Sequence, residues 1–123
     1  MFRKISSRGL SVLIFLAAAQ AQAAGWTNSA TPTGFDFVTV AVPGIMVYGE
    51  FGNANSCSMT DRFFMPKAGN EQQYTQIVAA LLSANALGRK VQVWISSCTE
   101  HPWYSSPGTT YNTFMGAHLS FRD

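Results

Sequence analysis

The residues best suited to chemistry are two histidines, and neither has an obvious partner. His101 lies in a polar stretch, where it could form a general acid/base pair with Asp61 or Glu50. The simpler interpretation is an exposed loop histidine. His118 falls on an expected strand, where a half-exposed side chain is the simplest interpretation. Neither histidine has acidic or cysteine neighbours at metal-ligand spacing, so we expect no metal site.

Nucleophile and cofactor motifs are absent. The sequence contains no Gly-x-Ser-x-Gly motif and no glycine-rich phosphate loop. Both cysteines are expected to be bonded to each other, which leaves no free thiol for a cysteine–histidine pair. We therefore predict no catalytic residue and no cofactor, and we expect that the protein is not an enzyme. A small hydrolase that uses His101 is the minor alternative.

Three aromatic residues in a loop rich in Pro, Gly and Ser are the best ligand-binding candidates. Trp103, Tyr104 and Tyr111 lie in or beside the expected loop 99–111. Each has a large apolar body and a polar tip, which suits stacking on a sugar or anchoring a protein interface. The alternative is that the loop folds back and these rings fill one end of the fold.

The two cysteines, Cys57 and Cys98, indicate a disulfide. An even pair in an exported chain is most simply bonded. The bond would close a loop of about 42 residues and contribute roughly 4 kcal/mol on the chain-entropy model. A metal or redox thiol pair is the weaker alternative, because no Cys-x-x-Cys spacing occurs.

The first 23 residues read as a secretory signal peptide. An apolar stretch at 10–19 follows a basic start and precedes the cleavage-site pattern Ala21-Gln-Ala. The basic residues are Arg3, Lys4 and Arg8. The apolar stretch is about half the roughly 20 residues that cross a bilayer. We therefore expect an exported protein, periplasmic or secreted, with no membrane insertion after signal removal.

Removal of this segment changes the charge balance. The whole chain has eight Lys and Arg against six Asp and Glu, a formal net charge of +2. Three of the basic residues leave with the signal peptide, so the remainder has five basic and six acidic residues, a net −1. A chain without a basic surface is not expected to bind nucleic acid.

Alternating patterns and one helical pattern define the expected elements. Asn70 and Gln73 resemble a capping box, and Gly88 suits the position after a helix end. The apolar stripe between them comprises Tyr74, Ile77, Val78, Leu81 and Leu82. The expected strands are 35–42, 45–51, 61–65, 91–95 and 113–121, and the expected helix is 71–87.

This order, three strands, one helix and two strands, predicts a mainly β domain with one helix, of α+β class. We expect the OB-like five-stranded barrel, which has this order, and the alternative is an ordinary sheet capped by a helix. We expect one domain at 35–123, preceded by a mobile N-terminal arm at 24–34.

Part of the sequence resembles a group of small exported bacterial proteins. The segments that carry the resemblance are Cys57-Ser-Met-Thr-Asp-Arg-Phe-Phe-Met, the helix end Ala-Leu-Leu-Ser-Ala-Asn-Ala-Leu-Gly-Arg-Lys, and Val-Gln-Val-Trp-Ile-Ser-Ser-Cys98. They are similar to the B subunits of subtilase-cytotoxin-like A–B toxins. The resemblance implies an OB-fold, a pentameric ring and glycan binding. None of the toxin subunits' sugar-contacting residues is assigned to a position in this chain.

Together these observations predict an exported, non-catalytic binding module. Its partner would be a glycan or a protein, contacted through the loop 99–111, and it would form a homo-oligomer, a pentamer if it follows the toxin subunits. The alternative is a monomeric periplasmic binding or inhibitor protein. Molar mass in solution separates the two hypotheses.

Overall fold

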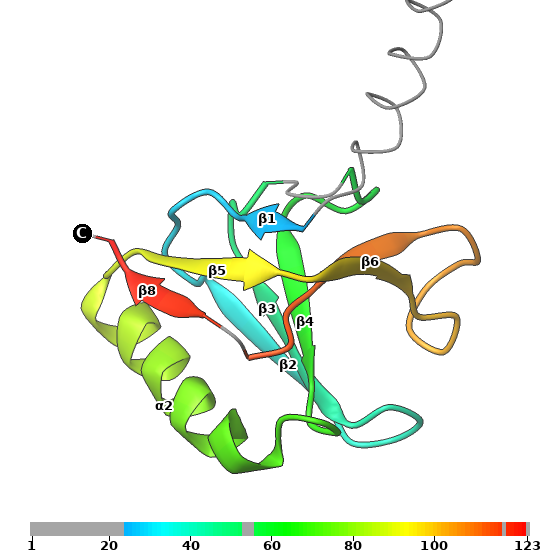
Figure 1. Cartoon of the computed structure of the whole chain (residues 1–123), viewed down its shortest axis with the longest axis horizontal. Coiled ribbons are helices and arrows are strands. Elements are labelled where there is room, and N and C mark those ends of the chain that lie inside the picture. The colour runs from blue at the N-terminus through cyan, green and yellow to red at the C-terminus, as the bar shows by residue number, and fades with distance from the viewer. Residues whose placement is uncertain (1–23, 53–55, 117, 123) are drawn as a thin grey trace, which may run out of the picture.

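Figure 1 shows the computed structural model, which describes residues 24–52, 56–116 and 118–122. The expected signal peptide at 1–23 lies outside the described residues. The described chain is a mixed α+β fold with one helix and a disulfide, as predicted. Its elements are β1 (Gly25–Trp26), β2 (Gly34–Val38), β3 (Gly44–Tyr48), β4 (Arg62–Pro66), α2 (Glu71–Leu87), β5 (Val91–Ile95), β6 (Ser97–Glu100), β7 (Thr110–Thr113) and β8 (Leu119–Phe121).

The larger sheet has five strands in the order β2-β3-β4-β7-β6. Strands β2 and β3 form the expected antiparallel hairpin, and β4 pairs antiparallel with β3. Strand β7 lies parallel to β4 and antiparallel to β6. A late segment of the chain therefore occupies an interior position in the sheet.

The smaller sheet has three strands in the order β1-β5-β8. The expected arm at 24–34 contains β1, and the N–H of buried Thr27 donates to the carbonyl of Val93 at 2.9 Å. Ser96 alone separates β5 from β6, so the segment 91–100 enters both sheets. The described strands form two sheets, and no closed sheet joins them.

Helix α2 has the predicted bounds and covers the main core. Leu81 and Ala84 are fully buried against β3, β4 and β5. Leu82, expected in the apolar stripe, is 43% exposed, because the buried face continues through Ala84 instead. Gly88 ends the helix in the left-handed conformation at φ 67°, as predicted. The side chain of Asn70 makes no cap hydrogen bond and donates instead to the carbonyl of Pro66.

Three expected strands have the wrong extent. The strand expected at 45–51 ends at Tyr48. The strand expected at 35–42 ends at Val38, because Val38 already pairs with Gly44 and residues 39–43 form the hairpin loop. The strand expected at 113–121 is two strands in different sheets, β7 and β8. Between them Phe114 turns into the core and Gly116 adopts a positive φ of 74°, which ends the extended run.

Candidate functional site

The loop between β6 and β7, residues 101–109, folds back onto the outer face of the larger sheet. The carbonyl of His101 accepts the N–H groups of Tyr104 at 2.8 Å and Ser105 at 3.0 Å, which forms a tight turn. Further along, the N–H of Gly108 donates to a carboxylate oxygen of Glu100 at 2.9 Å. The loop expected at 99–111 is thus shorter than predicted and internally hydrogen bonded.

The turn places four aromatic rings of the loop and β7 against one another. We call these rings the loop cluster, and its members are His101, Trp103, Tyr104 and Tyr111. Neighbouring ring centroids lie 5.0 Å apart for His101–Trp103 and 5.8 Å apart for Trp103–Tyr104 and for Tyr104–Tyr111. The cluster packs on Met46 of β3 and Phe64 of β4.

The structure brings the three predicted ligand-binding residues together but gives them unequal exposure. Tyr111 is 2% exposed, whereas Trp103 and Tyr104 are half-buried at the rim of the cluster. Trp103 and Tyr104 therefore remain accessible to a ligand, and Tyr111 supports them from below.

The expectation that His101 is an exposed loop histidine is wrong. Its side chain is 5% exposed, with the Phe64 ring centroid at 4.7 Å and the Tyr111 ring centroid at 5.6 Å. Burial lowers the pKa of His101. Its Nε2 atom is buried and has no hydrogen-bond partner in the described chain.

A polar network borders the loop cluster and joins the loop 101–109 to strands β2, β3 and β4. The Tyr104 hydroxyl donates to Asp36 of β2 at 2.7 Å and lies 2.5 Å from the Tyr48 hydroxyl of β3. The Arg62 guanidinium of β4 lies 4.6 Å from the Tyr48 ring centroid, and it pairs with Asp61 at 2.8 Å. Phenol, carboxylate and guanidinium groups thus lie side by side next to the aromatic rings.

Neighbouring groups and burial shift the pKa values of Tyr104 and Asp61 in this network. Burial, followed by the hydrogen bonds to Tyr48 and Asp36, raises the pKa of Tyr104 above the usual phenol range. The hydrogen bond from Arg62 lowers the pKa of Asp61. At neutral pH the network therefore presents a neutral phenol beside an ion pair.

Sequence reasoning did not identify Asp36, Tyr48 or Arg62 as site residues. All three lie on the outer face of the larger sheet, opposite the main core, and β4 delivers Arg62 opposite Tyr48 in register. The period-two alternation of β2 and β3 carried this signal, since Asp36 pairs with Met46 on that face. No local sequence pattern indicates that Tyr104, a loop residue, bonds to side chains of these strands.

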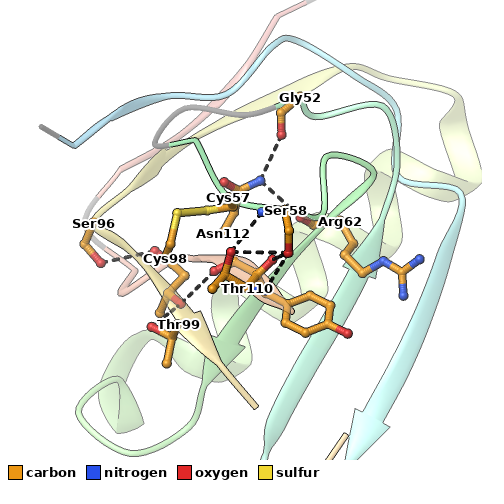
Figure 2. Close-up of a disulfide and its surroundings, with 11 residues drawn as sticks. Gly52, Cys57, Ser58, Arg62, Ser96, Cys98, Thr99, Thr110 and Asn112 are labelled. Atoms are coloured by element: carbon orange, nitrogen blue, oxygen red, sulfur yellow. Dashed lines mark hydrogen bonds between the residues drawn. A yellow bond between two sulfur atoms is a disulfide. The ribbon is translucent and has the colours of Figure 1, made fainter. Parts of the chain in front are cut away.

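The disulfide fixes the base of the loop cluster. Cys57 and Cys98 are bonded, as predicted, with 5.4 Å between their Cα atoms. Beside the bond, the Ser58 N–H donates to the Thr110 hydroxyl at 2.8 Å, and the Thr110 N–H donates to the Ser58 hydroxyl at 2.6 Å (Figure 2). The ends of the loop 101–109 are therefore held by strand pairing, a covalent bond and reciprocal hydrogen bonds.

The acid/base partners considered for His101 lie elsewhere. Asp61 binds Arg62, and Glu50 lines a polar hollow together with Asn28 and Thr60. Within the described ranges, no group of three or more His, Cys, Asp or Glu side chains could hold a metal ion. No helix of the described chain is long and apolar enough to cross a membrane.

Comparisons of this chain with protein-family models, with curated proteins and with solved structures gave no match.

Proposed function

We propose that this protein is an exported, non-catalytic recognition module that binds a glycan through the rim of the loop cluster. One observation carries the proposal. The half-buried Tyr104 ring stands beside Trp103 while its hydroxyl is fixed between Asp36 and Tyr48.

This arrangement has the two kinds of contact that a sugar needs. The apolar face of a sugar ring stacks on an aromatic side chain, and its hydroxyls bond to groups held in place. The rings of Trp103 and Tyr104 supply the first kind of contact, and Asp36, Tyr48 and Arg62 supply the second. Because hydrogen bonds and the disulfide hold the loop, ordering it on binding would cost little.

The strand order supports an OB-like barrel as part of the same proposal. In an OB-fold, five strands form a partly open Greek-key barrel whose ligand face includes strands two and three and the neighbouring loops. The five-stranded sheet here, with β1 continuing toward β2 and pairing with β5, is compatible with that arrangement. On this mapping β3 and β4 would form the ligand face, and they lie beneath the loop cluster.

Assembly into a B-subunit-like ring is the further part of this proposal, and the alternative is a monomeric periplasmic inhibitor. Exposed apolar residues in the β2–β3 hairpin support the inhibitor alternative. Phe37 is 54% exposed and Val40 72% exposed, near Ala41 with its positive φ of 59°. An exposed apolar hairpin of this kind suits a protein partner.

The test is a glycan array probed with the oxidised, exported protein, followed by calorimetry on each hit. The Tyr104→Phe variant keeps the ring and removes the hydroxyl that positions Asp36 and Tyr48, so it should weaken binding about five- to tenfold, which corresponds to about 1 to 1.4 kcal/mol. The matched control is Leu87→Ser, an exposed helix position far from the loop in sequence, which should bind like wild type.

Two outcomes would overturn the proposal. Wild-type affinity in Tyr104→Phe would exclude the network, and an empty array together with capture of a protein ligand would favour the inhibitor. Light scattering gives the oligomeric state separately. A mass of five chains supports the ring, and a mass of one chain removes it without affecting the glycan site.

A further inference from the structure

The underside of the loop 101–109 holds a titratable group that the proposed ligand surface does not use. The His101 ring is enclosed by Phe64 from β4, Trp103 from the loop and Tyr111 from β7. Its Nε2 atom has no partner in the described chain, and neither has the buried hydroxyl of Ser105. Of these three contacts, the one with Trp103 is made within the loop, so it requires the loop to stay folded back.

We propose that protonation of His101 opens the loop 101–109, so that the chain carries an acid-sensitive switch beside its aromatic surface. Both nitrogens of an imidazolium are donors, and an unpaired donor in an apolar enclosure is costly. An opened loop gives the protonated ring access to water. The switch itself does not depend on any ligand, but its effect on glycan binding rests on the proposed function.

Burial alone lowers the pKa of His101, with no offsetting contribution from a surrounding charge. The titratable and charged groups on the elements around this ring are Asp36 on β2, Tyr48 on β3, Asp61 and Arg62 at β4, Glu100 on β6, Tyr104 in the loop and Tyr111 on β7. The Asp36, Asp61 and Glu100 carboxylates accept hydrogen bonds from Tyr104, Arg62 and Gly108. The Arg62 guanidinium, 6.0 Å from the Tyr111 ring centroid, adds a positive charge nearby.

The direction of the effect follows from the two protonation equilibria. Burial places the pKa of His101 in the closed loop below its ordinary value of 6.5. An opened loop takes up a proton near pH 6.5, while the closed loop does not. Closure is therefore fully favoured above that pH. Below it, the ratio of open to closed loop rises about tenfold per pH unit, until the pKa of the closed form is reached.

Amide hydrogen exchange measured by NMR on the oxidised protein tests the switch. The reporters are the amides of Tyr104 and Ser105, which donate to the His101 carbonyl. Protection factors, corrected for intrinsic exchange, should fall about tenfold per pH unit below 6.5 in the wild type. They should stay constant in His101→Phe, which keeps an aromatic ring. They should fall as in wild type in the control His118→Phe, whose histidine is exposed.

A direct titration of the His101 ring protons keeps the proposal testable if His101→Phe does not fold. A pKa below 6.5 in the wild type supports the switch. A pKa at or above 6.5 would mean that the three rings stabilise the imidazolium through cation–π contacts, and it overturns the proposal. Protection that does not change with pH, or that falls equally in His101→Phe, overturns it as well. No ligand is needed, so failure of the glycan proposal leaves this result intact.

Discussion

Replacing Cys57 and Cys98 together by alanine removes the covalent tether at the base of the loop cluster. The bond joins residues separated by 41 positions. For a closed loop of that size the chain-entropy relation gives about 4 kcal/mol of unfolding free energy at 25 °C. On this model the loss comes from the greater conformational freedom of the unfolded chain. In the folded state the reciprocal hydrogen bonds between Ser58 and Thr110 still hold the two segments together. We therefore expect a large loss of stability with little change in the native structure.

The assay is urea denaturation of the wild type and the double variant, with an amide NMR spectrum of each in the absence of urea. The spectra should overlay away from Cys57 and Cys98, and the free energies should differ by about 4 kcal/mol. Ser58→Ala is the control, and it should cost about 0.5 to 1.5 kcal/mol. A difference below about 1 kcal/mol in the double variant, or a spectrum altered throughout β6 and β7, would refute the reasoning.

Three further predictions concern the helix and the tyrosine network. Leu81→Ala should lower the urea-unfolding free energy by about 2 to 5 kcal/mol because it empties a fully buried site, while exposed Leu82→Ala should change it by about 0.5 kcal/mol. In Gly88→Ala the new methyl group meets no other atom, so only the backbone φ of 67° at this position should lower the unfolding free energy, by about 1 kcal/mol. An unchanged urea midpoint would contradict this. The folded-state pKa of Tyr104 is raised above its ordinary value of 10.0, so the unfolded chain loses its phenol proton first and stability falls as pH rises above about 10. Urea curves at pH 9 and 11 should show a smaller fall in Tyr104→Phe than in wild type, and an equal fall would count against the raised pKa.

Local patterns predicted the elements that local interactions form. The helix bounds followed from its apolar spacing and from Gly88, and the β2–β3 hairpin followed from alternation around Pro43-Gly44. The disulfide followed from the even count of cysteines in a chain expected to be exported. In each case neighbouring residues carried enough information to set the backbone.

Contacts between residues far apart in the sequence determine the features that local patterns did not predict. The polar setting of His101 suggested exposure, but Phe64, distant in sequence, provides the surface that buries it. Likewise Tyr104 finds Asp36 68 positions away, which no motif or spacing announces. The pattern at 113–121 predicted one continuous strand. Its two ends instead belong to β7 and β8, which pair with strands of different sheets.

The interior position of β7 has a consequence for how the chain is made. Until Thr110–Thr113 has been synthesised, β4 has an unpaired edge and β6 has no neighbour in its sheet. A nascent chain that stops before Thr110 therefore exposes an open strand beside apolar side chains, which favours pairing with other chains. The β4 edge is covered only after Thr110–Thr113 has been synthesised, so β2, β3 and β4 stay open to pairing with other chains until this much later segment joins them.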